Sequence, residues 1–223
     1  MISEEYIEIF NQASLLTRQG KLEEALIRWD LIVAPQDKPD KSKVVTGDFL
    51  GQAHMRKAWV LMDLERYEEA LEIFLSEVMA ALITQFSLET LYDYFFSYAN
   101  TLGSLGRIEE MDDKFTRALN IASEEFGDQA KCEQCWQGLL THARKHDALD
   151  YLIQESERCV QFSVNNGLAE LFVFSITHAI EANIEKGNLV NAKELSSKYL
   201  KQATFWSNVE LIGEANRYLD KCN

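Results

Sequence analysis

A short phrase that recurs along the chain constrains its fold more than any other feature. It reads GKLEEAL from Gly20, ERYEEAL from Glu65, GRIEEM from Gly106 and, more weakly, GNLVNA from Gly187. His146 takes the corresponding place in a fourth, degenerate copy. A phrase that returns every 40 to 45 residues is typical of a protein built from repeated structural units. We therefore expect an array of similar units.

Each copy of the phrase predicts a turn between two antiparallel helices. Glycine in the left-handed conformation commonly ends a helix, and glutamates are favoured in the first turn of the next helix. Only two prolines are present, apolar residues recur at helical spacing, and no stretch alternates as a strand does. The sequence predicts an all-α protein with about five helix pairs, a C-terminal capping helix and a loop at 35–42. The expected helices are 4–19, 22–33, 48–64, 67–84, 88–105, 108–126, 131–145, 148–164, 168–186, 189–205 and 207–222.

The two helices of each pair are expected to meet at one position in the middle of the first helix and one early in the second. Small side chains at such a contact let the helix axes approach closely. The expected first-helix residues are Ala13, Ala58, Ala99, Leu139 and Ile180. Their expected second-helix partners are Ala25, Ala70, Met111, Tyr151 and Ala192.

This pattern resembles the tetratricopeptide repeat (TPR). The family pattern asks for a small residue in each helix, a Gly-x-Leu or Gly-x-Tyr turn, and a large residue one turn later. The first three pairs match it moderately well, with the large residue at Trp29, Phe74 and Phe115. The fourth pair, with Lys145-His146-Asp147-Ala148, matches poorly, and the fifth has Ser196 in place of the aromatic residue. The interval also exceeds the 34 residues usual in the family. The resemblance implies a right-handed α-solenoid, formed by residues 1–223 as one domain, whose first helices line a concave groove.

The resemblance also implies that a protein or peptide partner binds in this groove. Large aromatic anchors and adaptable methionines are typical of grooves that bind a peptide or a helix. The alternative is that the same side chains pack between helices as core. No ring of Lys and Arg surrounds Asn100, so the basic clamp that some members of the family use for a C-terminal carboxylate is not expected. The candidate groove residues are Phe10, Ser14, Thr17, Met55, Trp59, Met62, Asp93, Phe96, Asn100, Trp136, Leu140, Thr177 and Glu181.

The net charge of −14, from 36 acids and 22 bases, limits the classes of partner. Nucleic acids and anionic membrane surfaces are recognised by clustered Lys and Arg, so neither is expected to bind. A basic partner is compatible with this charge. An alternative function is that of an acidic stoichiometric inhibitor, such as a bacterial immunity-type protein that neutralises a basic toxin or enzyme.

The N-terminal residues do not have the basic segment and apolar run of a signal peptide, and no stretch is apolar enough for a membrane span. Four cysteines are too few for a disulfide scaffold. We expect a cytoplasmic protein with reduced thiols, and the sequence leaves its oligomeric state open.

Cys132, Cys135, His142 and His146 have side chains that suit zinc, but all four fall on one expected helix. From Cys135 to His142 the helix rises about 10 Å, so one ion cannot bind the whole set. We expect these cysteines to be small apolar core residues rather than metal ligands or a redox pair. The repeated glutamate pairs suit helix N-termini better than a catalytic site. We therefore expect that the protein is not an enzyme and that it binds no metal and no cofactor.

Overall fold

The same turn joins the first and second helices of all five pairs, whether or not glycine is present. Gly20, Gly106 and Gly187 have φ of +73°, +74° and +75°, and Glu65 and Asp147 adopt the same left-handed region with φ of +59° and +52°. In each turn the amide that follows this residue donates to a carbonyl five residues earlier, over 2.8 to 3.0 Å. This hydrogen bond is that of a Schellman cap, which ends one helix and fixes the direction of the next.

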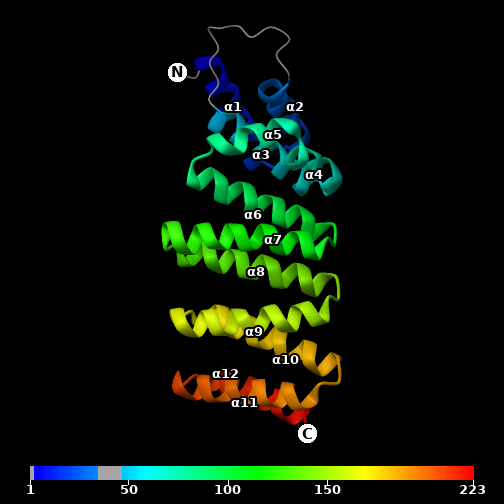
Figure 1. Ribbon diagram of the computed structural model, residues 1–223, viewed down its shortest axis with the longest axis vertical. Helices are drawn as coiled ribbons and strands as arrows, with labels where there is room; N and C mark the ends of the chain where they lie inside the picture. Colours follow the sequence, from blue (N-terminus) through cyan, green and yellow to red (C-terminus); the bar gives the residue numbers. More distant parts are fainter. Residues whose placement is uncertain (1–2, 35–46) are drawn as a thin grey trace. The chain divides into compact units, whose positions relative to one another are not determined.

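The computed structural model describes residues 3–34 and 47–223, and within these ranges it contains helices and no strand (Figure 1). The predicted all-α helical repeat, with five helix pairs and a last single helix, is confirmed. The loop expected at 35–42 lies outside the described residues. The helices are α1 (Glu4–Arg18), α2 (Leu22–Val33), α3 (Gly47–Asp63), α4 (Tyr67–Leu75), α5 (Glu77–Leu82), α6 (Leu88–Ser104), α7 (Ile108–Asn120), α8 (Gln129–Lys145), α9 (Leu149–Asn166), α10 (Ala169–Glu185), α11 (Leu189–Phe205) and α12 (Val209–Lys221).

The single helix expected over 67–84 is wrong, because the chain breaks at Ser76. This residue is extended, with ψ of 147°, and its hydroxyl accepts the amide of Met79 at 3.2 Å as an N-cap of α5. A 3₁₀ turn (Ile83–Gln85) follows α5. The expected helix over 108–126 ends instead in a π-helical segment (Ile121–Phe126) before the left-handed Gly127.

The fourth pair corrects the predicted register by one residue. The left-handed residue of its turn is Asp147 and not His146. When positions are counted from this left-handed residue, Leu140 takes the place of the first-helix contact residue and Leu152 that of its second-helix partner. Both leucines are fully buried. The predicted second-helix partner Tyr151 is instead half-buried. Leu139 is also buried, but it does not occupy the place of Ala13, Ala58 and Ala99.

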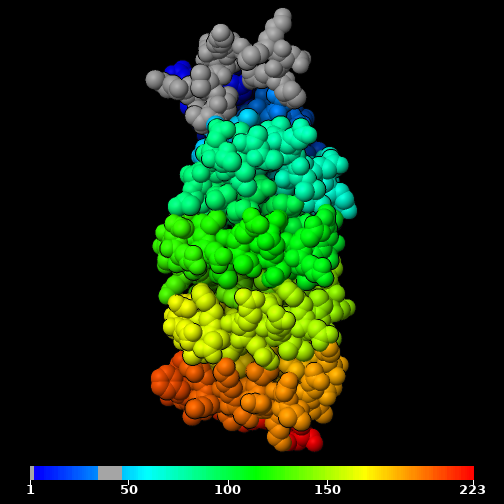
Figure 2. All heavy atoms as spheres, in the orientation of Figure 1, coloured from blue at the N-terminus to red at the C-terminus, as the bar shows by residue number. Residues whose placement is uncertain are grey.

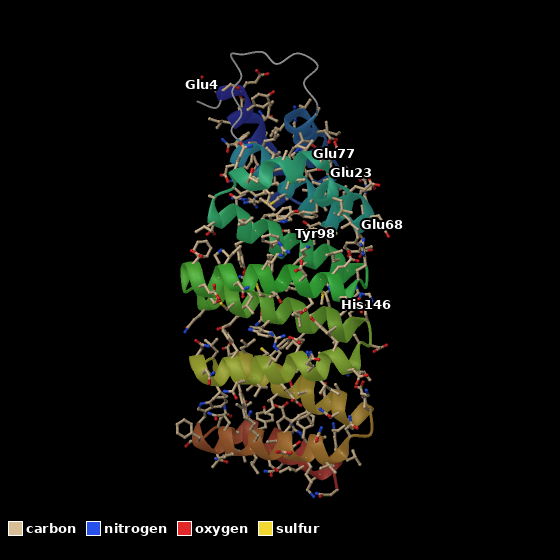
Figure 3. The ribbon with its side chains drawn as sticks, in the orientation of Figure 1. Glu4, Glu23, Glu68, Glu77, Tyr98 and His146 are labelled. Atoms are coloured by element: carbon tan, nitrogen blue, oxygen red, sulfur yellow. The ribbon has the colours of Figure 1, made fainter. Side chains whose placement is uncertain are left out.

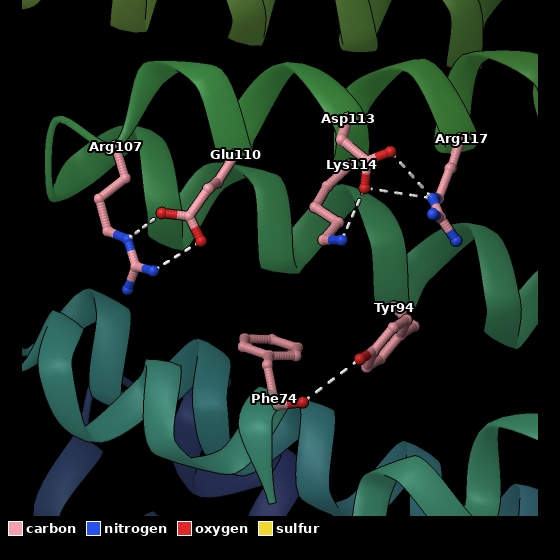
Figure 4. Close-up of polar contacts among 7 residues, drawn as sticks. All are labelled: Phe74, Tyr94, Arg107, Glu110, Asp113, Lys114 and Arg117. Carbon is pink, nitrogen blue, oxygen red and sulfur yellow. Dashed lines mark hydrogen bonds and ion pairs between the residues drawn. The ribbon is translucent and has the colours of Figure 1, made fainter.

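The chain divides into two compact units, which we call unit 1 (Met1–Gln129) and unit 2 (Ala130–Asn223). In the core of unit 1 the rings of Phe74 and Tyr98 stack with centroids 5.2 Å apart, and the Tyr94 hydroxyl donates to the Phe74 carbonyl at 3.3 Å (Figure 4). In unit 2, Phe172 packs edge-on against Tyr199 and Trp206. Buried residues of α10, α11 and α12 share one core cluster, and the space-filling view shows a continuous surface over this end of unit 2 (Figure 2).

Candidate partner-binding surface

In unit 1 the first helices α3 and α6 lie side by side along a polar seam. The Gln52 amide donates to Thr90 at 3.4 Å, and the Thr101 hydroxyl donates to the Met62 sulfur at 3.1 Å. Between them, the Trp59 indole donates to the Ser97 hydroxyl. These pairs are separated by 38 or 39 residues in every case. Because the sequence separation of the paired residues is nearly constant along the seam, the two first helices run parallel and in register.

Trp59 is the large side chain at the middle of this seam, and it is half-buried. The guanidinium of Arg56 lies over its ring, 4.3 Å from the centroid, which is the geometry of a cation–π contact. Partial burial lowers the pKa of Arg56, the charge of Asp93 acts in the opposite direction, and the charge of Arg18 lowers the pKa further. Charged groups from α1, α3 and α6 therefore act on one another across this face of unit 1.

Several predicted groove residues lie at the surface of these helices, and others do not. Three are buried: Met55, Trp136 and Leu140, with exposed fractions of 2%, 5% and 0%. They offer almost no surface to a partner. The other candidates are half-buried: Phe10, Ser14, Thr17, Trp59, Met62, Asp93, Phe96, Asn100, Thr177 and Glu181.

Two half-buried aromatic candidates pack against neighbouring helices. Phe10 lies edge-on against Trp29 of α2 at 4.9 Å and contacts Phe49 of α3 at 5.1 Å. Phe96 stacks on Tyr92 at 5.7 Å and meets Phe115 of α7 edge-on at 5.9 Å. Both rings thus join the helices of unit 1, and only part of each ring is open to solvent.

The register error in the fourth pair explains why Trp136 and Leu140 were selected as groove residues. Counted from Asp147, the groove positions of α8 are Gln137 and Thr141, which are both exposed. The sequence did contain a signal for this register. Aspartate tolerates the left-handed conformation better than most residues.

In unit 2 the first helices α10 and α12 frame a surface pocket of about 570 Å³. It is lined by Ala169, Glu170, Val173, Phe174, Trp206, Asn208 and Leu211. One turn further along α10 lies Thr177, and Glu181 on the next turn accepts the Tyr218 hydroxyl of α12 at 2.8 Å. The face of unit 2 that holds the predicted Thr177 and Glu181 therefore also holds an apolar pocket, which the sequence analysis missed.

The second helices carry much of the acidic charge in their first turns. Glu23 and Glu68 lie at such positions (Figure 3). Some acids are neutralised within the chain, since Arg66 binds Glu69 at 2.6 Å and Arg107 binds Glu110 at 2.6 Å (Figure 4). The glutamate pairs therefore lie at the positive ends of helices, as the sequence analysis expected.

The Cys and His residues do not form a metal centre in the part of the chain that the structure describes. No group of three His, Cys, Asp or Glu side chains is placed to hold an ion there. Cys132 and Cys135 are buried free thiols. Burial raises the pKa of the Cys159 thiol to about 12 and lowers the pKa of His54 and His142 to about 4. At neutral pH the Cys159 thiol and these two imidazoles are therefore uncharged.

Comparison with known proteins bears on the fold. No family model matches the chain, and no curated protein matches it. Crystal structures of the nearly identical TPR-like repeats of a Podosopora anserina protein, described as a kinesin light chain, are similar to it. One has a TM-score of 0.66 at 13% identity over 95% of both chains. A single-residue variant of those repeats has a TM-score of 0.64 at 14% identity, over 92% of this chain and 97% of that chain. The chain has the TPR-like repeat fold.

At this level of identity the similarity shows the fold alone. TPR-like repeats commonly mediate protein–protein interaction. Within residues 3–34 and 47–223 no helix is long and apolar enough to cross a bilayer.

Proposed function

We propose that the chain is a non-catalytic cytoplasmic module that binds a peptide or helix of a protein partner along the face formed by its first helices. The observation that carries this proposal is the seam between α3 and α6. Trp59, Met62 and Asn100 are half-buried there, and Arg56 and Asp93 bring charge to the same face. Large aromatic and sulfur side chains beside charged groups are typical of interfaces.

The first-helix face is a better candidate than the acidic surface of the second helices. Several second-helix acids are already paired with Arg or Lys of the chain, as in the bonds from Arg66 to Glu69 and from Lys114 to Asp113. Exposed pairs of this kind contribute little to stability, but they reduce the charge available to a basic partner. The proposal therefore places the partner on the first helices rather than on an acidic inhibitor surface.

Site-resolved photocrosslinking in the native cell tests this proposal. A photoreactive amino acid would replace Thr17 or Asn100 on the first helices. Matched controls would replace Thr116 or Asn120, which are exposed on the second helix α7. We expect a discrete protein adduct from the first-helix positions alone. Adducts from the α7 positions alone would place the partner on the acidic surface, and the absence of a protein adduct at all four positions would contradict the proposed function.

A further inference from the structure

The pocket between α10 and α12 differs from the rest of unit 2 because apolar side chains surround it at the surface. Val173, Phe174, Trp206 and Leu211 form its apolar wall. Trp206 is fixed there, since its ring meets Phe172 edge-on at 5.4 Å. A pocket of about 570 Å³ is within the range that holds ligand groups.

Two exposed apolar residues flank this wall in the chain. Phe205 precedes Trp206 and is 80% exposed, and Val209 follows Asn208 and is 81% exposed. Their side chains contribute little to the core. An exposed Phe next in sequence to a residue that lines an apolar pocket is typical of an interaction site rather than of a solvated turn.

The repeat itself shows that this apolar character is local. Gly127, Gly167 and Ser207 are the left-handed residues between successive repeats and lie 40 residues apart. Two positions before them stand Glu125, Asn165 and Phe205. Two positions after them stand Gln129, Ala169 and Val209. Phe and Val therefore replace smaller or polar residues of the preceding copies, so the turn geometry does not require them.

The charge beside the pocket indicates what the occupant carries. Glu170 is the only charged residue of the lining, and within residues 3–34 and 47–223 no ion pair is formed by it. Glu210, in the first turn of α12, adds a second carboxylate next to Val209. A cation at this place would be attracted by both groups, whereas an acidic occupant would be repelled.

We propose that this pocket binds a protein segment that inserts a large apolar side chain between α10 and α12 and places a Lys or Arg within one helical turn of it, next to Glu170. The proposal rests on the proposed function, protein binding, and names the chemistry of one partner segment. The apolar side chain supplies affinity through burial in the pocket, and the basic residue supplies selectivity through the carboxylates.

Selection of random 12-residue peptides displayed on phage against the full chain tests this pocket. We expect the selected peptides to share a large apolar residue with Lys or Arg within four positions. Ala169→Trp fills the pocket from an exposed position in the first turn of α10, and Glu170→Lys reverses the charge. Each variant should weaken binding of a synthetic selected peptide at least tenfold by fluorescence anisotropy.

Two matched variants control for a general effect of these changes. Ala130→Trp adds the same ring at an exposed position in the first turn of α8, and Glu157→Lys makes the same charge reversal on α9. Both should bind the peptide as the unaltered chain does. Peptides that bind but are insensitive to Ala169→Trp would overturn the pocket and leave the proposed function intact. Selected peptides that are purely apolar would overturn the role of Glu170. Failure to select any peptide, together with no adduct at Thr17 or Asn100, would contradict the proposed function itself.

Discussion

At the scale of single residues, the turns show what the backbone requires of a side chain. Glu65 and Asp147 are held at φ of +59° and +52°, where a side chain costs about 1–2 kcal/mol and glycine costs nothing. Replacement by glycine removes this cost, but it also destabilises the folded state by about 0.5–1 kcal/mol, because glycine gives the unfolded chain more conformational entropy. We expect Glu65→Gly and Asp147→Gly each to stabilise the protein by up to about 1 kcal/mol in urea unfolding.

The reverse change at a glycine of the same turn type is the control. A Cβ at Gly20 or Gly187 would meet no atom within 4 Å, so Gly→Ala there tests the backbone alone. It should destabilise the protein by about 1 kcal/mol. If the substitutions to glycine and the substitutions of glycine by alanine changed the free energy of unfolding equally, the sign of φ would not matter in these turns.

A different glycine is needed because of packing. A Cβ at Gly51 of α3 would lie 2.1 Å from the Phe86 ring, whereas a Cβ at Gly213 of α12 would meet nothing. Gly51→Ala should therefore cost about 1–3 kcal/mol through overpacking. Gly213→Ala should stabilise by up to about 1 kcal/mol, because alanine is the better helix residue. Thermal midpoints of the two variants should move in opposite directions, and a shift in the same direction would contradict the Phe86 contact.

At the scale of the helices, the corrected register of α8 makes a direct prediction. Leu140 is fully buried, and Thr141 beside it is exposed. Leu140→Ala should cost about 2–5 kcal/mol, the usual range for a core leucine. Thr141→Ala should change the free energy of unfolding by no more than about 0.5 kcal/mol. If the two costs were reversed in urea unfolding, Leu140 would be the groove residue and the turn would lie at His146.

The sequence predicted these helices well where local chemistry and the repeat agree. The range 189–205 was predicted to the residue, because Gly187 ends the preceding helix and the copy at Ala192 sets the register. The break at Ser76 was missed because its capping role competes with a continuous apolar pattern across 67–84. The fourth turn was misplaced by one residue because it has neither glycine nor the Glu-Glu pair that marks the second turn, at Glu65, without a glycine.

The site was less predictable than the helices because burial depends on distant partners. The sequence placed Trp59 and Met62 at the surface of α3, and both are half-buried there. It could not show that Met55 of the same helix is 2% exposed. The pocket of unit 2 was missed because it is formed by the start of α10, the end of α11 and the start of α12, which no single motif joins.

Two half-buried histidines make the stability of the chain depend on pH. Burial and the charge of Lys57 lower the pKa of His54 to about 4; burial and neighbouring charges do the same for His142. In the unfolded chain both titrate near 6.5. Between pH 4 and pH 6.5 the unfolded state binds more protons than the folded state does. The free energy of unfolding is therefore highest, as far as these imidazoles are concerned, above about pH 6.5, and it decreases as the pH falls towards 4.

The double variant His54→Gln and His142→Gln should therefore lose less stability between pH 7.5 and pH 5 than the unaltered chain does. Paired carboxylates such as Glu185 and Asp113 have lowered pKa values and contribute below this window. His146→Gln removes one of the charges that lower the pKa of His142, so it should reduce the pH dependence by less than the double variant does. An unaltered slope of the thermal midpoint in the double variant would contradict the burial of these imidazoles in the neutral form.

Residues 1–223 are expected to behave as one domain. The structure has two compact units that meet in sequence at Gln129 and Ala130, inside the first turn of α8. Domain boundaries usually fall in flexible linkers, and this one falls within a helix. In addition, a helical repeat buries its apolar faces against neighbouring repeats, which couples their stabilities. We therefore propose that the whole chain unfolds as one cooperative domain.

Leu152→Ala tests this cooperativity, because Leu152 is fully buried in unit 2. The substitution should cost about 2–5 kcal/mol. In a single domain it should speed hydrogen exchange of the slowest amides of α3 and α6 in unit 1 as much as those of α10 and α11. Leu61→Ala, at a buried leucine of unit 1, is the reciprocal variant and should also affect both units. If each substitution changed exchange in its own unit alone, the two units would be independent domains.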